Sequence, residues 1–203
     1  MKAILYKNGG IFLVKDHPIP RPKDDEVLIK VTFSGICGTD LAILRGYYGF
    51  EGILGHEFTG IVVKAPLGHE YLNGKRVVGE INIGCRRCIY CKEGLERHCP
   101  NRKTIGISGA DGAFAEYLRL PLRNIHILPE SISDEEAVFT EPIAACLEIL
   151  EQVHVKPSWK VVIMGDGRMG LIAAQILALT GCDLLLVGSH EEKLTIAQTL
   201  GIN

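Results

Sequence analysis

The sequence has few aromatic residues, no excess of either charge and no long apolar run. Aromatic side chains occupy 6% of the 203 positions, and the formal net charge is −2. Surfaces that bind nucleic acids or anionic membranes need clustered Lys and Arg, so this balance argues against both kinds of partner. No apolar segment is long enough to span a bilayer. The first apolar run ends at Lys7 and Asn8, which is too early for a signal peptide.

The remaining composition is that of a globular protein with a buried core. Hydrophobic residues make up 47% of the chain and charged residues 23%, and the length suits one large domain or two small ones. Seven cysteines occur without an export signal. Because disulfides are rare in reducing compartments, we expect a cytoplasmic protein that uses its thiols for metal binding.

Four of the cysteines fall within fifteen residues, at Cys85, Cys88, Cys91 and Cys99. Tetrahedral zinc takes four thiolates at such spacings, and a site closed in this way stabilises a loop but leaves no position for substrate. The alternatives are two disulfides or a redox-active Cys-x-x-Cys pair. We predict a structural zinc in a lobe formed by residues 84–104, with the chemistry elsewhere in the chain.

The hydrophobic pattern divides the chain into two parts. Short strands separated by turns, over 2–7, 11–15, 26–33, 59–64 and 75–81, predict a mainly-β barrel or sandwich. A helical pattern begins near residue 131 and is interrupted at Pro142, where we expect a kink or a second helix. We therefore predict a mixed α/β fold with a first domain over 1–155 and a second over 156–203.

The second part begins with a strand, a glycine-rich turn and a helix. A buried parallel strand is predicted over 160–164 and a helix over 171–180, followed by a strand over 183–187 and a helix over 191–200. Between the first two elements lies Gly165-x-Gly167-x-x-Gly170. This order of elements is typical of a dinucleotide-binding turn, in which the glycines admit the pyrophosphate and the helix N-terminus binds it. Arg168 and Met169 lie inside the motif. A glycine turn without a ligand is the alternative.

The end of the second strand bears on the choice between NAD and NADP. NAD sites usually have an acidic residue there, whereas this chain has Gly188 followed by Ser189. The small residue leaves space for a 2′-phosphate, and Ser189 and Lys193 offer a hydroxyl and a cation to bind it. Glu191 and Glu192 oppose that binding by charge. On balance, the sequence favours NADP over NAD.

A second group of metal-ligand types comes from two other segments. Cys37 lies in a glycine-containing turn after a strand, and His56 follows Gly55. A catalytic zinc takes two or three such ligands and keeps one position open. From the residues alone, a metal site and a buried thiol beside a satisfied histidine remain equally open.

Several motifs together resemble one family. They are Cys37-Gly-Thr-Asp40, Gly55-His-Glu57, the four-cysteine lobe, Gly112-Ala-Phe-Ala-Glu-Tyr117, Glu141-Pro142 and the Gly165–Gly170 turn, in this order. The chain is similar over its whole length to zinc-dependent alcohol dehydrogenases of the medium-chain dehydrogenase/reductase family, which includes polyol and threonine dehydrogenases. The resemblance implies a GroES-like catalytic domain followed by the start of a Rossmann domain.

The resemblance also implies residue roles. Cys37, His56 and Glu141 match the ligands of a catalytic zinc, and Cys85, Cys88, Cys91 and Cys99 match those of a structural zinc, giving two zinc ions per chain. Asp40 matches the acid that orients the zinc-binding histidine, and Glu57 matches a carboxylate that can approach the metal. Thr39 matches the hydroxyl that receives the substrate proton.

The implied reaction is hydride transfer between an alcohol and NAD(P), with zinc lowering the pKa of the alcohol. Glu141 slightly favours secondary alcohols or polyols as substrates, and a homo-oligomer is implied for the full-length enzyme. The Rossmann pattern stops after its second helix, so we expect an N-terminal portion with impaired cofactor binding by itself. Two alternatives remain: a non-catalytic zinc-stabilised binding module and a thiol redox protein.

Overall fold

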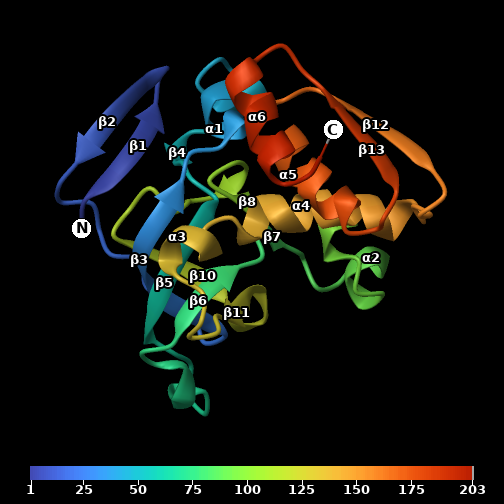
Figure 1. Cartoon of the computed structure of the whole chain (residues 1–203). Coiled ribbons are helices and arrows are strands. Elements are labelled where there is room, and N and C mark those ends of the chain that lie inside the picture. The colour runs from blue at the N-terminus through green and yellow to red at the C-terminus, as the bar shows by residue number, and fades with distance from the viewer. Residues whose placement is uncertain (203) are drawn as a thin grey trace. The chain divides into compact units, whose positions relative to one another are not determined.

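The computed structural model describes residues 1–202 and consists of two compact units, one over 1–141 and one from Pro142 onward (Figure 1). The boundary lies earlier than the predicted boundary at residue 155. Its physical reason is helix α4 (Thr140–Gln152), whose later residues Ile149 and Leu150 pack on the hydrophobic core of the second unit.

The first unit is built on a five-stranded antiparallel sheet with the strand order β10-β3-β5-β6-β11. The strands are β10 (Tyr117–Pro121), β3 (Glu26–Gly35), β5 (Glu57–Lys64), β6 (Arg76–Gly79) and β11 (Ile125–Ile127). Irregular register between β3 and β5, on either side of Val31, bends the pair. The bend helps the sheet to curl around one core.

That core consists of side chains that alternate along the strands. Val27 and Ile29 of β3 are completely buried, as are Val77 of β6 and Leu120 of β10. Alternate residues of a strand face the same side, so a single face of the curved sheet supplies these contacts. The predicted mainly-β body of a mixed α/β fold is confirmed.

Two smaller sheets accompany the main one. The first has the order β2-β1-β4, with β1 (Ala3–Lys7), β2 (Gly10–Val14) and β4 (Gly52–Ile53). The second has the order β7-β8-β9, with β7 (Asn82–Ile83), β8 (Lys103–Ile105) and β9 (Gly109–Ala110). The predicted strands over 2–7 and 11–15 correspond to β1 and β2, which pair as a hairpin whose turn residues Asn8 and Gly9 both have positive φ.

Short helices occupy the connections of the first unit. They are α1 (Gly38–Ile43), α2 (Ile89–Lys92) and α3 (Asp134–Ala137), with single 3₁₀ turns η1 (Tyr47–Gly49), η2 (Glu70–Leu72), η3 (Glu96–His98) and η4 (Leu122–Asn124). Two helices, α3 and α4, replace the long helical pattern, as Pro142 suggested. Pro142 itself lies in the first turn of α4, where a missing N–H breaks no helical hydrogen bond.

The second unit contains β12 (Lys160–Met164), α5 (Arg168–Ala178), β13 (Asp183–Val187) and α6 (Glu191–Thr199). The two strands pair in parallel, within the bounds that the sequence predicts. Helix α5 begins three residues earlier than predicted, so Gly170 lies in its first turn. In residues 1–202, no helix is both long and apolar enough to cross a membrane.

Burial of the β12–β13 sheet differs from the prediction. Val161, Ile163, Leu184 and Leu186 contribute to the core beneath α5 and α6. The alternate residues do not: Val162 is 56% exposed and Met164 is 87% exposed. The prediction of a buried strand was therefore wrong for one face, because within residues 1–202 only one face of this two-stranded sheet is covered by helices.

Candidate metal centres and nucleotide-binding turn

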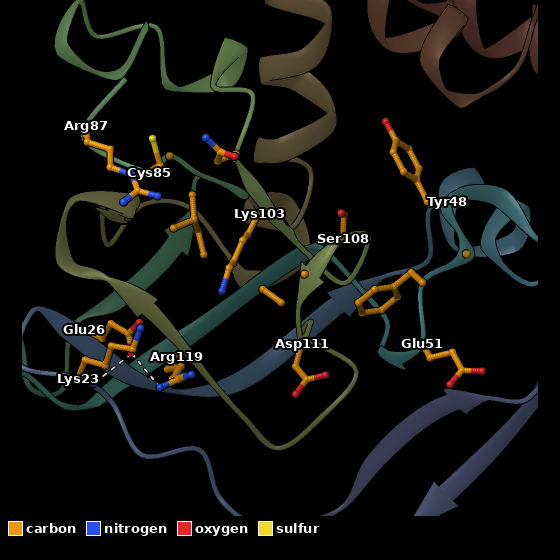
Figure 2. Close-up of a pocket in the computed structure, with 17 residues that line it drawn as sticks. Lys23, Glu26, Tyr48, Glu51, Cys85, Arg87, Lys103, Ser108, Asp111 and Arg119 are labelled. Carbon is orange, nitrogen blue, oxygen red and sulfur yellow. Dashed lines mark hydrogen bonds and ion pairs between the residues drawn. The ribbon is translucent and has the colours of Figure 1, made fainter. Parts of the chain in front are cut away.

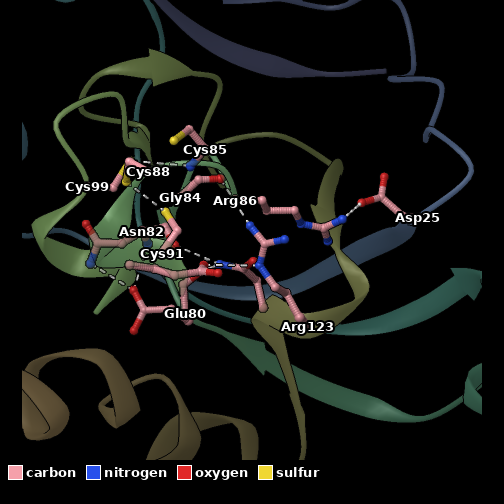
Figure 3. A network of polar contacts seen from close by, with 12 residues as sticks. Asp25, Glu80, Asn82, Gly84, Cys85, Arg86, Cys88, Cys91, Cys99 and Arg123 are labelled. Carbon is pink, nitrogen blue, oxygen red and sulfur yellow. Dashed lines mark hydrogen bonds and ion pairs between the residues drawn. The ribbon is translucent and has the colours of Figure 1, made fainter. Parts of the chain in front are cut away.

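The four cysteines of the lobe, Cys85, Cys88, Cys91 and Cys99, converge on one point. Their sulfur atoms all lie within 4.8 Å of one another, and Figure 3 shows them grouped near Asn82, the first residue of β7. Cys88 is the N-cap residue of helix α2, which includes Cys91, and the turn η3 leads into Cys99. No disulfide joins any cysteine of residues 1–202.

The electrostatics of this cluster fit a cation. Backbone N–H groups of Arg87 and Cys88 lower the pKa of Cys85 to about 6, and the N–H of Cys85 also donates to Cys99 Sγ at 3.4 Å. By contrast, burial and the neighbouring thiols raise the pKa of Cys91 to about 12. Four thiolates at this separation repel one another unless a cation lies between them, and a dication that binds sulfur meets that need.

Two arginines connect the cysteine lobe (residues 84–104) to the rest of the first unit, whose curved five-stranded sheet is called the barrel below. Arg123 donates from Nε to Glu96 Oε2 and from Nη2 to the Gly84 carbonyl, both at 3.1 Å. Arg86 forms an ion pair with Asp25 at 2.9 Å, so its guanidinium is directed to the barrel (Figure 3). The backbone N–H of Arg86 hydrogen-bonds Cys91 and lowers the pKa of that thiol.

A second cluster forms where α1 and β5 begin. The structure brings ligand atoms of Cys37, His56 and Glu57 within 4.8 Å of one another. Cys37 is the residue that precedes α1, and Glu57 begins β5 directly after His56. His56 is only 2% exposed and Glu57 8%. A thiol, an imidazole and a carboxylate are all zinc ligands, so the donor set fits this metal.

Asp40 holds this cluster together. Its carboxylate accepts from the Cys37 N–H at 2.8 Å and from the Gly55 N–H at 3.2 Å. It also faces His56 Nδ1 at 3.5 Å, an atom that is buried and has no hydrogen-bond partner. Burial disfavours the charged imidazole, but Asp40 and Cys37 outweigh it and raise the pKa of His56 to about 10. With Nδ1 turned to Asp40, Nε2 is the nitrogen available to a metal.

Close backbone contacts fix the segment that carries His56. Gly55 has a φ of 91°, and its carbonyl accepts from the Ala113 N–H at 2.8 Å. A Cβ on Gly106 or on Gly112 would overlap that same carbonyl. The three glycines therefore bring three loops into contact at a separation that no side chain permits. The segment from Gly112 to Glu116 belongs to this junction, and β10 begins at Tyr117.

Thr39 and Glu141 lie at the edge of the cluster. The Cys37 thiol lies 3.7 Å from Thr39 Oγ1, and Thr39 also lines a cavity of about 510 Å³ together with Tyr47 and Tyr48. Burial raises the pKa of Glu141, and the charge of His56 opposes that rise. Glu141 is thus near enough to interact with His56, although it lies outside the group of three.

A larger groove lies away from this cluster. It encloses about 790 Å³ and includes Lys23, Arg87, Lys103 and Arg119 in its lining (Figure 2). Arg119 pairs with Glu26 at 3.2 Å. None of the predicted catalytic residues lines it, although Cys85 of the lobe does. The larger cavity is therefore not the one that borders the predicted catalytic residues.

The glycine turn of the second unit has the geometry of a phosphate cradle. A Cβ on Gly165 or Gly167 would meet no atom within 4 Å, whereas one on Gly170 would overlap the Gly165 carbonyl. Gly170 thus allows α5 to pack closely, while the first two glycines leave open space before the N-terminus of α5. Arg168 and Met169 are the first two residues of that helix. The turn fits a pyrophosphate.

The residues beyond β13 are organised by a side chain that the sequence analysis missed. Asp166, inside the glycine turn, accepts from the Ser189 N–H at 2.9 Å and from the His190 N–H at 2.6 Å. Of the predicted phosphate ligands, the Ser189 hydroxyl lies 3.3 Å from His190 Nδ1, and Lys193 lies in the first turn of α6. An acid between the first two glycines was the signal available in the sequence.

Comparison with known proteins gives the family. The model of the alcohol dehydrogenase GroES-like domain matches residues 23–130. The chain belongs to this family. The resemblance inferred from the sequence motifs is confirmed, and so is the expected GroES-like fold of the first unit.

Individual relatives extend over both units. A sorbitol dehydrogenase of Halalkalibacterium halodurans is 33% identical over 211 residues, which cover 100% of this chain and 61% of that protein. A solved short chain alcohol dehydrogenase from Escherichia coli, complexed with NADH, has a TM-score of 0.92 and 29% identity, covering 100% of this chain and 61% of its own. A zinc-binding dehydrogenase from Sinorhizobium meliloti, bound to NADP, has a TM-score of 0.91 and 35% identity, with 100% and 60% covered. The chain thus spans about three fifths of the length of these relatives.

Proposed function

We propose that the chain is the catalytic portion of a zinc-dependent dehydrogenase that moves a hydride between an alcohol, either a secondary alcohol or a polyol, and a nicotinamide dinucleotide. The observation that carries this proposal is the convergence of Cys37, His56 and Glu57 beside the hydroxyl of Thr39. A closed four-thiol site elsewhere and an open glycine turn in the second unit support it. The sorbitol dehydrogenase among the relatives supports the substrate class.

Each residue of the cluster has a role in this proposal. Cys37 and His56 would hold the zinc, with Glu141 as a third ligand and Glu57 as a further carboxylate beside them. When bound, the zinc supplies Lewis-acid chemistry. Asp40 fixes the tautomer and orientation of His56 through Nδ1. Thr39 accepts the proton of the substrate hydroxyl and passes it toward solvent. Cys85, Cys88, Cys91 and Cys99 hold the structural zinc.

The dinucleotide binds, in this proposal, with its pyrophosphate before Gly167 and the N-terminus of α5. The argument from sequence for NADP depended on free space beside Gly188. Asp166 fills that space, which removes the support that the small residue at Gly188 gave to NADP. Assembly into a homo-oligomer stays a prediction for the full-length enzyme.

Metal stoichiometry tests the proposal. Elemental analysis of the purified chain should give two zinc ions per chain, one on the Cys37→Ala variant and one on the Cys88→Ala variant. Cys182→Ala, which removes a thiol outside both clusters, should retain two. A wild-type chain with a single zinc, retained in Cys37→Ala but lost in Cys88→Ala, would instead support the non-catalytic binding module. A chain without zinc and with a reversible disulfide would support the thiol redox protein.

A further inference from the structure

The space beside the end of β13 is already filled from within the chain. A Cβ placed on Gly188 would overlap Cβ and Oδ2 of Asp166. Gly188 is the position at which NAD-binding folds usually carry their acid. Here the carboxylate reaches the same place from the glycine turn, one strand away. The end of β13 therefore has a negative charge beside it, even though residue 188 is a glycine.

The partners of Asp166 are the groups that a phosphate would use. Its carboxylate accepts from the backbone N–H groups of Ser189 and His190, and both of its oxygens lie 3.0 Å from His190 Nδ1. The Asp166 side chain is only 8% exposed. Backbone N–H groups that follow a strand and precede a helix are a common anion-binding arrangement. In this chain the Asp166 carboxylate accepts these hydrogen bonds in the place of a bound anion.

We infer that Asp166 is a specificity-determining residue that makes the chain bind NAD in preference to NADP. This inference rests on the proposed function. A 2′-phosphate beside β13 would meet a carboxylate and two N–H groups that already have an acceptor. The other nearby charges also disfavour it, since Glu191 and Glu192 begin α6 and the His190 ring is paired with Asp166. Lys193 is then the one cation left in the first turn of α6.

Hydrogen-bond geometry also explains why the arrangement is stable. The N–H of His190 is the main contributor that lowers the pKa of Asp166 to about 2, and burial opposes it only in part. The carboxylate is therefore ionised at every pH at which the protein would be assayed. A phosphate would have to displace a charged acceptor from buried N–H groups, at a cost larger than that of filling an empty site.

Binding measurements on three variants test the inference. Isothermal titration calorimetry on the wild-type chain should give a Kd for NADP that is at least tenfold above the Kd for NAD. Asp166→Ala frees both N–H groups and should lower the ratio of the two constants by about tenfold or more. Asp166→Asn keeps an acceptor but loses the charge, and should lower the ratio less. Glu192→Gln removes a nearby charge without touching the N–H groups, and its ratio should stay within about threefold of wild type.

Amide resonances give a second readout that does not require the nicotinamide. Adding adenosine 2′,5′-bisphosphate should shift the amide signals of Ser189 and His190 in Asp166→Ala but not in wild type, and the rest of the spectrum verifies that the variant is folded. An unchanged ratio in Asp166→Ala, or a wild-type preference for NADP, would overturn the inference while leaving the dehydrogenase proposal intact. Failure of every form to bind either dinucleotide would overturn the inference, whereas the dehydrogenase proposal is tested separately by the zinc stoichiometry.

Discussion

Asp40 shows how much one buried carboxylate can position. It connects the start of α1, the Gly55 turn and the imidazole of His56, three groups from two segments of the chain. Only 2% of the residue is exposed, so solvent does not compete for these contacts. Because it faces His56 Nδ1, it determines which nitrogen a metal can use.

Replacing Asp40 with Asn should therefore weaken the catalytic zinc selectively. The amide keeps the size of the side chain but loses the charge that orients and polarises His56, and loss of such a partner costs about 10–100-fold in metal affinity. Competition with a chromophoric chelator, read as two binding steps, measures this. The step assigned to the four-cysteine site should not change.

The matched control is Asp25→Asn, which also removes one carboxylate from the first unit. Asp25 pairs with Arg86 at a position where both side chains are about half exposed, so neither binding step should move appreciably. Equal loss at both sites in Asp40→Asn would mean that the residue supports folding and has no particular role toward His56.

Residue types and spacing were sufficient to predict a metal site in the cysteine lobe, but for Cys37 and His56 they left a metal site and a buried thiol equally open. They were insufficient for Asp166, because the motif permits any residue between its first two glycines. What gives Asp166 its role is the contact with Ser189 and His190 across two strands, which no local pattern encodes. The third ligand of the proposed catalytic zinc could not be identified from local sequence either. Glu57 adjoins His56 in sequence and in space, whereas Glu141 was proposed from the family resemblance alone.

At the scale of elements, Arg76 joins β6 to α3. Its guanidinium contacts Asp134 Oδ1 from Nε at 2.9 Å and donates from Nη2 to the Ile132 carbonyl at 2.7 Å. Burial disfavours ionised Asp134, but hydrogen bonding with Thr32 and the Arg76 charge outweigh it and lower the pKa of the carboxyl. Helix α3 has only four residues, so tertiary contacts of this kind hold it in place.

Arg76→Met should lower the free energy of unfolding by about 1–2 kcal/mol near neutral pH. A depressed folded-state pKa stabilises the protein above the unfolded-state pKa, about 3.9 for Asp, and this contribution disappears as the pH falls through the folded-state value. The difference between wild type and variant should therefore shrink as the pH falls below about 4. Urea unfolding at a series of pH values measures it.

Arg86→Met is the control for Arg76→Met, because it also removes an arginine that forms an ion pair with an aspartate. Its ion pair with Asp25 is about half exposed on both sides, and such pairs contribute about 0–1 kcal/mol. A loss in Arg76→Met that persists unchanged in acid would show that the aliphatic packing of Arg76, and not its charge, holds α3.

The limits of helices and strands were predicted most accurately where the hydrophobic pattern of the sequence was uninterrupted. The strands β12 and β13 are apolar runs bounded by polar or glycine residues, and their predicted limits are correct. The start of α5 was predicted too late, because Arg168 to Gly170 read as turn residues while their backbone is already helical. Very short strands such as β7 and β9 have two residues each. Their existence depends on tertiary pairing, which has no local signal.

For the molecule as a whole, the structural zinc should support the cysteine lobe but not the barrel. Most of the barrel core comes from strands outside residues 84–104, while α2 and η3 are single turns beside the cysteines. In Cys88→Ser, hydrogen exchange read by mass spectrometry should show residues 84–104 losing protection by about tenfold or more, with β3 and β5 unchanged.

Cys37→Ser provides the comparison, since it disrupts the other metal cluster and leaves the four lobe thiols in place. Its lobe should exchange at the wild-type rate. If Cys88→Ser also accelerated exchange throughout β3 and β5, the lobe would have to be regarded as part of the folding core.

The contact of Gly55 with Gly106 and Gly112 limits how this protein can be redesigned. Any library that diversifies the surroundings of His56 in search of new substrates has to leave these three codons untouched, since even alanine would push the loops apart. Useful diversity lies instead at Tyr47 and Tyr48, which border the adjoining cavity and are more than half exposed. The same backbone junction that keeps the histidine in place thus separates positions that evolution can vary from those it cannot.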